Sequence, residues 1–194
     1  MINEMQTVNP ILIGGSAGSV SVVMRLIEAF PSNLKAPVII IIHRQRNVES
    51  EMASILSRAH NRTRIIEPCD KEQILSGNIY LAPQNYHLLI ESDKTFSLDY
   101  SESVHHSRPS IDVSFESAAK VFNEELTGIL LSGANNDGTV GVQTILKYKG
   151  TAIVQDPASA EYPAMPLSAI RASKDVQVLT PGEIISFIKT LGTT

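Results

Sequence analysis

The stretch Pro10-Ile11-Leu12-Ile13-Gly14-Gly15-Ser16-Ala17-Gly18-Ser19 decides the fold, because it leads a short apolar strand through a glycine-rich turn. An amphipathic pattern over residues 20–30 follows directly and predicts a helix. A serine among small residues on a strand-to-helix turn presents its hydroxyl beside a helix N-terminus. That position suits a nucleophile, and it also suits a bound phosphate. The functional question is which of the two this loop serves.

Short apolar strands alternate with helical segments along most of the chain. Strands are predicted at 11–14, 38–42, 64–67, 127–132, 151–155 and 176–179, and helices at 20–30, 50–60, 111–122, 139–148, 166–172 and 181–191. Ser110 is the expected N-cap of the third helix, and Thr180-Pro181-Gly182-Glu183 forms a capping box before the last. The alternation predicts an α/β fold, a three-layer α/β/α sandwich with a doubly wound, mostly parallel sheet.

The middle of the chain departs from this alternation. Residues 77–82, 87–91 and 96–100 read as short strands separated by turn clusters, which predicts an antiparallel hairpin excursion from the main sheet. No repeat or long linker divides the chain, so residues 1–194 are expected to form one domain.

The composition narrows the functional classes. A hydrophobic fraction of 43%, a charged fraction of 19% and a net charge of −4 describe a globular protein with no basic block for nucleic acid. The run Arg44-Gln45-Arg46 is interpreted as a solvated loop. The single cysteine, Cys69, excludes an internal disulfide and is expected to be a small buried residue. No signal peptide or membrane-spanning run is evident, so a cytoplasmic protein that is not membrane-embedded is expected.

The polar residues that directly follow the predicted strands include three candidate catalytic residues. Ser16 follows the first strand, His43 follows the second, and Asp137 follows the strand at 127–132. Each residue alone has an ordinary structural explanation, as a cap, a strand end or a turn residue. Together they form the set that acyl transfer needs, because the carboxyl ends of parallel strands share one edge of a sheet.

Two other classes of protein use a similar loop. A dinucleotide-binding fold needs a third glycine at the place of Ser19 and an acidic residue after the second strand, where His43 and Arg44 stand. An α/β-hydrolase orders its residues as serine, acid and histidine, whereas here the histidine precedes Asp137. Both alternatives stay open and neither is favoured.

Several collinear motifs then point to one family. They are Ile13-Gly14-Gly15-Ser16-Ala17-Gly18, Ile42-His43, Tyr80-Leu81-Ala82-Pro83 with His87, Ser107-Arg108-Pro109-Ser110-Ile111-Asp112-Val113, Leu131-Ser132-Gly133-Ala134-Asn135-Asn136-Asp137-Gly138 and Ala164-Met165-Pro166. In these motifs the chain resembles, from about residue 10 to 191, the catalytic domain of the CheB-type chemotaxis protein-glutamate methylesterases.

The resemblance implies roles for individual residues. Ser16 takes the place of the nucleophile, His43 that of the base and Asp137 that of the orienting acid. Oxyanion donors are implied at Ala17 and in the loop that contains Ala134 and Asn135, and Arg108 is expected at the rim or in a structural salt bridge, with Asp112 beside it. Three motifs depart from the family pattern. Ala17 and Ser19 replace threonine and glycine, Ala134-Asn135 replaces methionine and glycine, and Arg44-Gln45 follows the histidine where a Met-Pro-like pair is usual.

The implied reaction is hydrolysis of glutamate methyl esters on the cytoplasmic region of chemotaxis receptors, through an acyl-enzyme, with glutamine deamidation in some members. No cofactor or metal ion is expected. About ten residues precede the first strand, so no receiver domain is expected in the chain, and a separate receiver or regulatory protein is a candidate partner. The alternative is a non-catalytic relative that keeps the fold and binds a partner.

Overall fold

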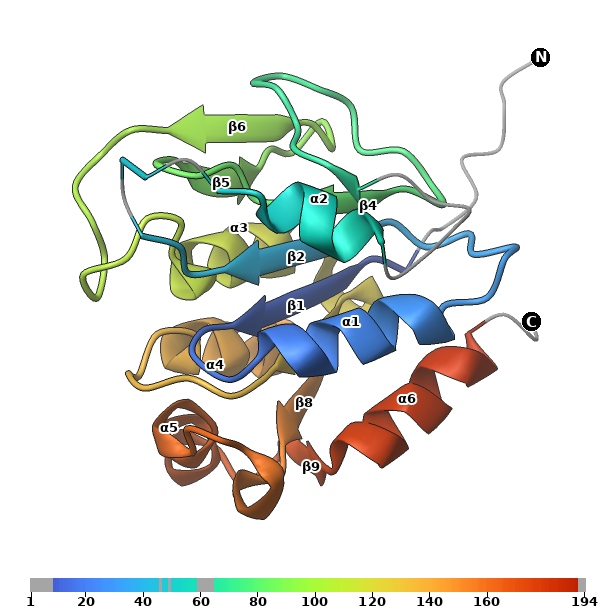
Figure 1. The fold of residues 1–194 in the computed structure, drawn as a ribbon, viewed down its shortest axis with the longest axis vertical. Helices are drawn as coiled ribbons and strands as arrows, with labels where there is room; N and C mark the ends of the chain where they lie inside the picture. Colours follow the sequence, from blue (N-terminus) through green and yellow to red (C-terminus); the bar gives the residue numbers. More distant parts are fainter. Residues whose placement is uncertain (1–8, 46, 49, 59–64, 192–194) are drawn as a thin grey trace.

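A computed structural model describes residues 9–45, 47–48, 50–58 and 65–191. Its main sheet has seven strands in the order β3-β4-β2-β1-β7-β8-β9, all parallel to their neighbours (Figure 1). The strands are β1 (Ile11–Gly15), β2 (Val38–Ile42), β3 (Ile65–Ile66), β4 (Ile79–Leu81), β7 (Thr127–Leu130), β8 (Thr151–Gln155) and β9 (Gln177–Leu179). A separate antiparallel pair consists of β5 (His87–Ile90) and β6 (Phe96–Asp99).

Six α-helices cover the two faces of the sheet. Their bounds are α1 (Val20–Ala29), α2 (Met52–Ser57), α3 (Ile111–Phe122), α4 (Thr139–Lys147), α5 (Ala164–Ala172) and α6 (Pro181–Thr190) among the described residues. Short 3-10 turns lie at Asn123–Glu125 and Pro157–Ser159. Figure 1 shows α1, α2 and α6 in front of the sheet, and α3 and α4 behind it. The three-layer sandwich predicted from the sequence is therefore confirmed.

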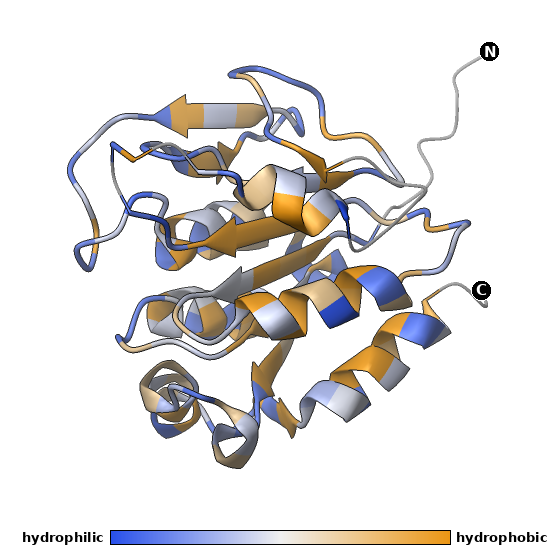
Figure 2. Ribbon diagram, in the orientation of Figure 1, coloured by the Kyte–Doolittle hydropathy of each residue, from blue (hydrophilic) through white to orange (hydrophobic). Residues whose placement is uncertain are grey.

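The strands form two hydrophobic cores because successive side chains point to opposite faces. On β2, Ile39 and Ile41 pack with α3, α4 and α5, whereas Val38, Ile40 and Ile42 pack with α1, α2 and α6. All five residues of β2 are buried, as expected for a parallel strand covered on both faces. The strands are accordingly the most uniformly apolar segments in Figure 2.

The order of the strands reverses direction around β1. The chain proceeds from β1 to β2 on one side, and later returns to place β7 on the other side. At such a switch point the loops beyond the two central strands diverge and leave a crevice, where ligands of open α/β sheets bind. Ser16 and Asp137 follow the two strands that meet there.

The turn after β1 requires a glycine at one position. Gly18 has a φ of +75°, and a Cβ on it would lie 2.8 Å from Ser132 Oγ and 2.7 Å from Glu161 Cβ. Only a residue without a side chain fits this left-handed conformation in this space. The glycine-rich turn is thus shaped by packing against the ends of the neighbouring strands.

Most elements agree with the predictions, and the middle of the chain needs one correction. The antiparallel hairpin exists as β5 and β6, but residues 77–82 do not belong to it. Instead, β4 pairs in parallel with β2 and β3 inside the main sheet. The helix predicted over 50–60 is described from Met52 to Ser57 and the strand predicted over 64–67 is β3; residues 59, 60 and 64 lie outside the described residues.

Two expectations about single residues were wrong. Cys69 is exposed, because it lies in the loop that leads from β3 toward β4. The side chain of Arg44 is only 4% exposed, since its guanidinium donates to Glu67 Oε1 at 2.6 Å and to the Ala82 carbonyl. Arg44 therefore ties the end of β2 to β3 and β4, and Arg46 lies outside the described residues. None of the helices in the described ranges is long and apolar enough to cross a membrane.

Candidate active site

The candidate site lies where β1, β2 and β7 end. The register pairs Gly15 with Ile42, so Ser16 and His43 are the next residues on two adjacent parallel strands. The His43 amide donates to the Gly15 carbonyl at 3.2 Å, which continues this pairing to the histidine. Asp137 enters from the loop between β7 and α4. The strand order thus gathers the three residues that the sequence placed at separate strand ends.

His43 and Asp137 form the strongest contact of the site. His43 Nε2 lies 2.7 Å from Asp137 Oδ2, and the carboxylate is fully buried. In the serine-protease triad the acid binds Nδ1 of the histidine and Nε2 is the base. Here the ring is reversed, so Nδ1 is the nitrogen left to accept a proton.

Asp137 also closes the N-terminus of α3. Oδ1 accepts hydrogen bonds from Ser110 Oγ at 2.8 Å, from the Asp112 amide at 3.0 Å and from the Gly138 amide at 3.0 Å. Oδ2 accepts one more from the Ile111 amide at 2.7 Å. These donors fix the carboxylate in place and use amides that a helix N-terminus leaves without partners inside the helix.

The pKa of Asp137 reflects a competition between burial and these contacts. Burial alone would raise the pKa, but the hydrogen bonds from His43, Asp112 and Ile111 outweigh it and hold the pKa below its ordinary value. The positive end of the α3 dipole acts in the same direction. Asp137 is therefore ionised at neutral pH and able to stabilise a protonated His43.

The second nitrogen of the His43 ring faces a serine that the sequence did not single out. Ser107 Oγ lies 3.1 Å from His43 Nδ1. The hydrogen bonds of the described residues include none between the Ser16 hydroxyl and the His43 ring, although the two residues are neighbours across β1 and β2. In this structure Ser107, not Ser16, is thus the hydroxyl on the base.

The turn that carries Ser16 is held by the end of β7. The Ser16 amide donates to the Ser132 carbonyl at 2.9 Å, and Ser132 Oγ donates to the Ala17 carbonyl at 2.8 Å. Ser19 Oγ donates back to the Ser16 carbonyl at 2.7 Å. Within the described residues, no hydrogen bond uses the amide of Ala17 or of Ala134, so both remain available as donors.

The side chains of Asn135 and Arg108 form hydrogen bonds with other groups of the protein and are not free at the rim of the site. Asn135 Oδ1 accepts from the Asp137 amide at 3.2 Å, and its Nδ2 donates to the His105 carbonyl at 3.4 Å. Arg108 is buried, donates to the Tyr100 and Ser101 carbonyls, and stacks on the Tyr100 ring at 3.9 Å. Arg108 thus anchors the segment before α3 through carbonyl groups and an aromatic ring, and the ion pairs found among the described residues do not include it.

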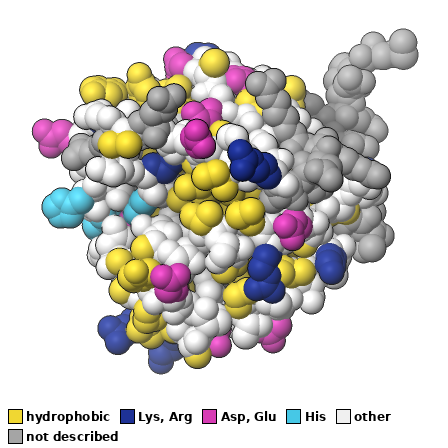
Figure 3. Space-filling model, viewed as in Figure 1, with side chains coloured by type: hydrophobic (Ala, Val, Ile, Leu, Met, Phe, Trp, Pro, Cys, Tyr) yellow, Lys and Arg dark blue, Asp and Glu magenta, His cyan; other side chains and the backbone are white. Residues whose placement is uncertain are grey.

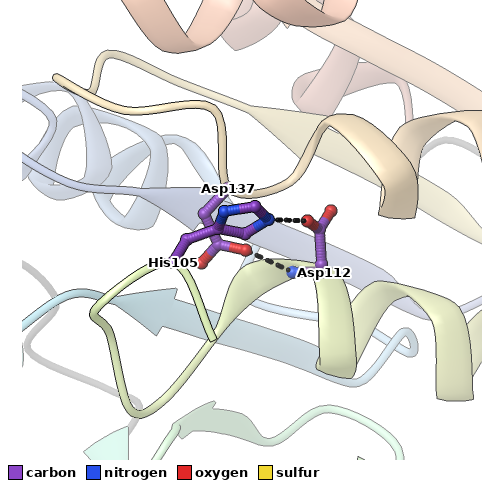
Figure 4. A group of neighbouring side chains, drawn as sticks. All are labelled: His105, Asp112 and Asp137. Atoms are coloured by element: carbon purple, nitrogen blue, oxygen red, sulfur yellow. Dashed lines mark hydrogen bonds and ion pairs between the residues drawn. The ribbon is translucent and has the colours of Figure 1, made fainter. Parts of the chain in front are cut away.

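One group of side chains in the described ranges offers ligand atoms suited to a metal ion. Atoms of His105, Asp112 and Asp137 all lie within 4.8 Å of one another (Figure 4). Figure 4 shows the His105 ring directed at the Asp112 carboxylate, and the Asp112 amide directed at Asp137. Because Asp137 already accepts from five donors, an ion would have to displace the contacts that orient it. The group therefore serves the local hydrogen-bond network.

Asp112 is a buried acid rather than a rim residue. Its side chain accepts from the Gly141 amide at 2.7 Å and pairs with His105 Nε2 at 3.3 Å. Burial, together with the charge of Asp137, raises the pKa of Asp112 to about 6 despite the Gly141 contact. The ionised form of Asp112 therefore weakens the folded state.

We expect the Asp112→Asn variant to be more stable than the wild type at neutral pH. The folded protein binds this proton more tightly than the unfolded chain does, so the wild type loses stability as the pH rises from about 4 to about 6. The free energy of unfolding of Asp112→Asn should exceed that of the wild type by an amount that grows over this pH range to at most about 3 kcal/mol. Chemical unfolding at a series of pH values measures it, with Asp175→Asn as an exposed control. A variant that is less stable at pH 8 would contradict the expectation.

A shallow pocket adjoins the base. It has a volume of about 370 Å³ and is lined by His43, Arg44, Gln45, Val48, Ser50, Glu51, Met52 and Ile55. Val48 and Ile55 are exposed apolar side chains in this lining. Figure 3 shows apolar side chains gathered near the centre of this face, and histidines at the left edge, where Figure 1 places the loop between β6 and α3. Apolar surface therefore lies next to the polar centre.

Fold and site together define a doubly wound α/β protein of the hydrolase type, with a serine, a histidine and an aspartate at the switch point of the sheet. The family described as CheB methylesterase matches residues 11–188, and the chain belongs to it.

Individual relatives agree with this assignment. A Leptospira interrogans protein with the provisional name protein-glutamate methylesterase/protein-glutamine glutaminase is 44% identical over 170 residues, or 88% of each chain. A Methanospirillum hungatei protein-glutamate methylesterase/protein-glutamine glutaminase is 31% identical over 96% of this chain and 53% of its own length. The crystal structure of the Thermotoga maritima CheB methylesterase catalytic domain superposes with a TM-score of 0.86 and 27% identity, covering 93% of this chain and 97% of that domain. The chain thus corresponds to the catalytic domain of the longer relatives.

Sequence reasoning missed three serines that organise the site. Ser110 was expected only as a helix cap, yet its hydroxyl also donates to Asp137. Ser132 and Ser107 had no expected role. Ser107 lies in the motif that precedes α3, so the motif marks the segment, but its contact with His43 spans 64 residues of sequence and depends on tertiary structure.

Proposed function

We propose that this protein is a serine hydrolase that removes methyl esters from glutamate side chains of chemotaxis receptors. The observation that carries the proposal is the buried contact between His43 and Asp137, with Ser16 beside His43 directly after the paired residues Gly15 and Ile42. Burying an acid and a histidine costs stability that a purely structural site would not need. The names of the relatives supply the substrate class.

Ser16 is the proposed nucleophile and His43 Nδ1 its base. Ser16 Oγ attacks the ester carbonyl while its proton passes to Nδ1, and Asp137 stabilises the imidazolium through Nε2. The proton on Nδ1 then passes to the departing methoxide, which leaves as methanol and yields an acyl-enzyme. Water, activated by the same nitrogen, adds to the acyl carbonyl and releases glutamate and free Ser16.

The negative oxygen that forms in each step needs fixed donors. The amides of Ala17 and Ala134 make no other hydrogen bond in the described structure, which supports them as the proposed oxyanion donors. Backbone donors need no particular side chain, so the alanines that replace the usual residues are compatible with this role. Hydrolysis of glutamine by the same steps would release ammonia in place of methanol, and we include it in the proposal.

The proposal is tested by methanol release from receptor fragments that carry labelled methyl esters. The purified protein should release methanol with time, and mass spectrometry should find free glutamate at the former ester sites. Binding of the receptor without any loss of methyl groups would point instead to the non-catalytic alternative. Fragments that carry glutamine at the same sites test deamidation in parallel.

A further inference from the structure

The Ser107 hydroxyl belongs to a tight hairpin over the site. Val104 and Ser107 exchange both backbone hydrogen bonds, at 3.2 and 2.9 Å, and the two residues between them have positive φ angles, +48° for His105 and +62° for His106. This is a two-residue turn of the type that joins antiparallel strands. We call residues 104–107 the base-contact hairpin, because its last side chain touches His43 Nδ1 at 3.1 Å.

The base-contact hairpin is attached to the site at two further points. His105 Nε2 pairs with the buried Asp112 Oδ2 at 3.3 Å, and the His105 carbonyl accepts from Asn135 Nδ2 at 3.4 Å. Both residues also bind Asp137 itself, since the Asp112 amide donates to Asp137 Oδ1 and the Asp137 amide donates to Asn135 Oδ1. The position of the hairpin is therefore coupled to the loop and the helix that hold the triad acid.

Ser107 and Ser16 require the same nitrogen. Asp137 occupies Nε2, so a neutral His43 carries its hydrogen there and has a single lone pair, on Nδ1. In this structure the Ser107 hydroxyl donates to that lone pair. The proposed mechanism assigns the Ser16 proton to the same lone pair, because Nδ1 is the ring nitrogen of His43 that Asp137 does not occupy.

We propose that Ser107 is an autoinhibitory contact built into the fold, which occupies the base nitrogen of His43 and must release it before Ser16 can react. This inference rests on the proposed function. It adds to that function a regulatory contact at the same site, between the Ser107 hydroxyl and His43 Nδ1. Release needs a change of the Ser107 rotamer or a small shift of the base-contact hairpin, and the His105–Asp112 pair opposes the latter.

The test compares Ser107→Ala with the wild type. Removing the hydroxyl should accelerate both methanol release and the covalent labelling of Ser16 by a fluorophosphonate, by about 2- to 10-fold, the factor that one net hydrogen bond represents. Ser107→Thr keeps the hydroxyl and should restore the slower rate. Equal or slower labelling of Ser107→Ala would overturn the inference.

A matched pair of variants tests the attachment of the hairpin. His105→Asn removes the contact with Asp112 and should also accelerate labelling, whereas His106→Asn makes the same change at the neighbouring exposed turn residue and should not. Asparagine tolerates the positive φ at both positions. In a Ser107→Ala background, His105→Asn should add little, because both changes free the same nitrogen. Equal effects of the two asparagine variants would overturn the role of the attachment.

The outcomes separate this inference from the proposed function. If the wild type releases methanol and Ser107→Ala is no faster, the autoinhibitory role of Ser107 is contradicted and the proposed hydrolase function is supported. A wild type and a Ser107→Ala variant that both fail to label and to release methanol sink both proposals. If the wild type neither labels nor releases methanol and the Ser107→Ala variant does both, the two proposals are supported.

Discussion

Replacing Ser16 with alanine should abolish methanol release from methylated receptor fragments, with a loss of about 10³- to 10⁶-fold in kcat. The change removes only the attacking oxygen. The turn itself is held by backbone groups, since the Ser16 amide and carbonyl bind Ser132 and Ser19. Stability should therefore change little, and the measurement is single-turnover methanol release at saturating protein.

The matched control for this variant is Ser186→Ala. Ser186 lies exposed on α6, and its hydroxyl donates to the Gly182 carbonyl one helical turn earlier. It should keep wild-type activity. Equal methanol release from Ser16→Ala and the wild type would show that Ser16 is not the nucleophile, and labelling of Ser16→Ala by a fluorophosphonate would direct attention to another serine near His43.

Asp137→Asn should lose about 10³- to 10⁴-fold in kcat, and it should also unfold more easily. An amide in place of the carboxylate cannot stabilise protonated His43. It also places an NH₂ group against one of two sets of donors. One set is the Ser110 hydroxyl with the Asp112 and Gly138 amides, and the other is the Ile111 amide with His43. Because the site is fully buried, a loss of about 2–5 kcal/mol in the free energy of unfolding is expected.

The measurement combines single-turnover kinetics with chemical unfolding of the same preparation. Asp175→Asn, an exposed residue, is the control and should be unchanged in both. A variant that loses stability but keeps its rate would make Asp137 a helix cap alone. The contribution of Asp137 to stability should also decline in acid, because its pKa in the folded protein lies below the ordinary value and its contacts are lost once it is protonated.

Local patterns in the sequence predicted the helices and strands well. They predicted poorly which distant strands pair with each other. The run Val38–Ile42 reads as a buried strand because all its residues are apolar, and it is one. Residues 77–82 read as part of the antiparallel hairpin, and that prediction was wrong. Their parallel pairing with β2 is decided by contacts across some 40 residues, which no local pattern encodes.

The sequence by itself determined the fold class, the three residues at the strand ends and the family, because each depends on residue types at fixed spacings along one element or one turn. Only the tertiary structure decided which groups meet around His43. It placed Asp137 on Nε2 and Ser107 on Nδ1, and it buried Asp112 beside them. The physical reason is that a hydrogen bond depends on the positions of two atoms to within a few tenths of an ångström. For residues 64 and 94 positions apart, packing of the whole sheet sets those positions.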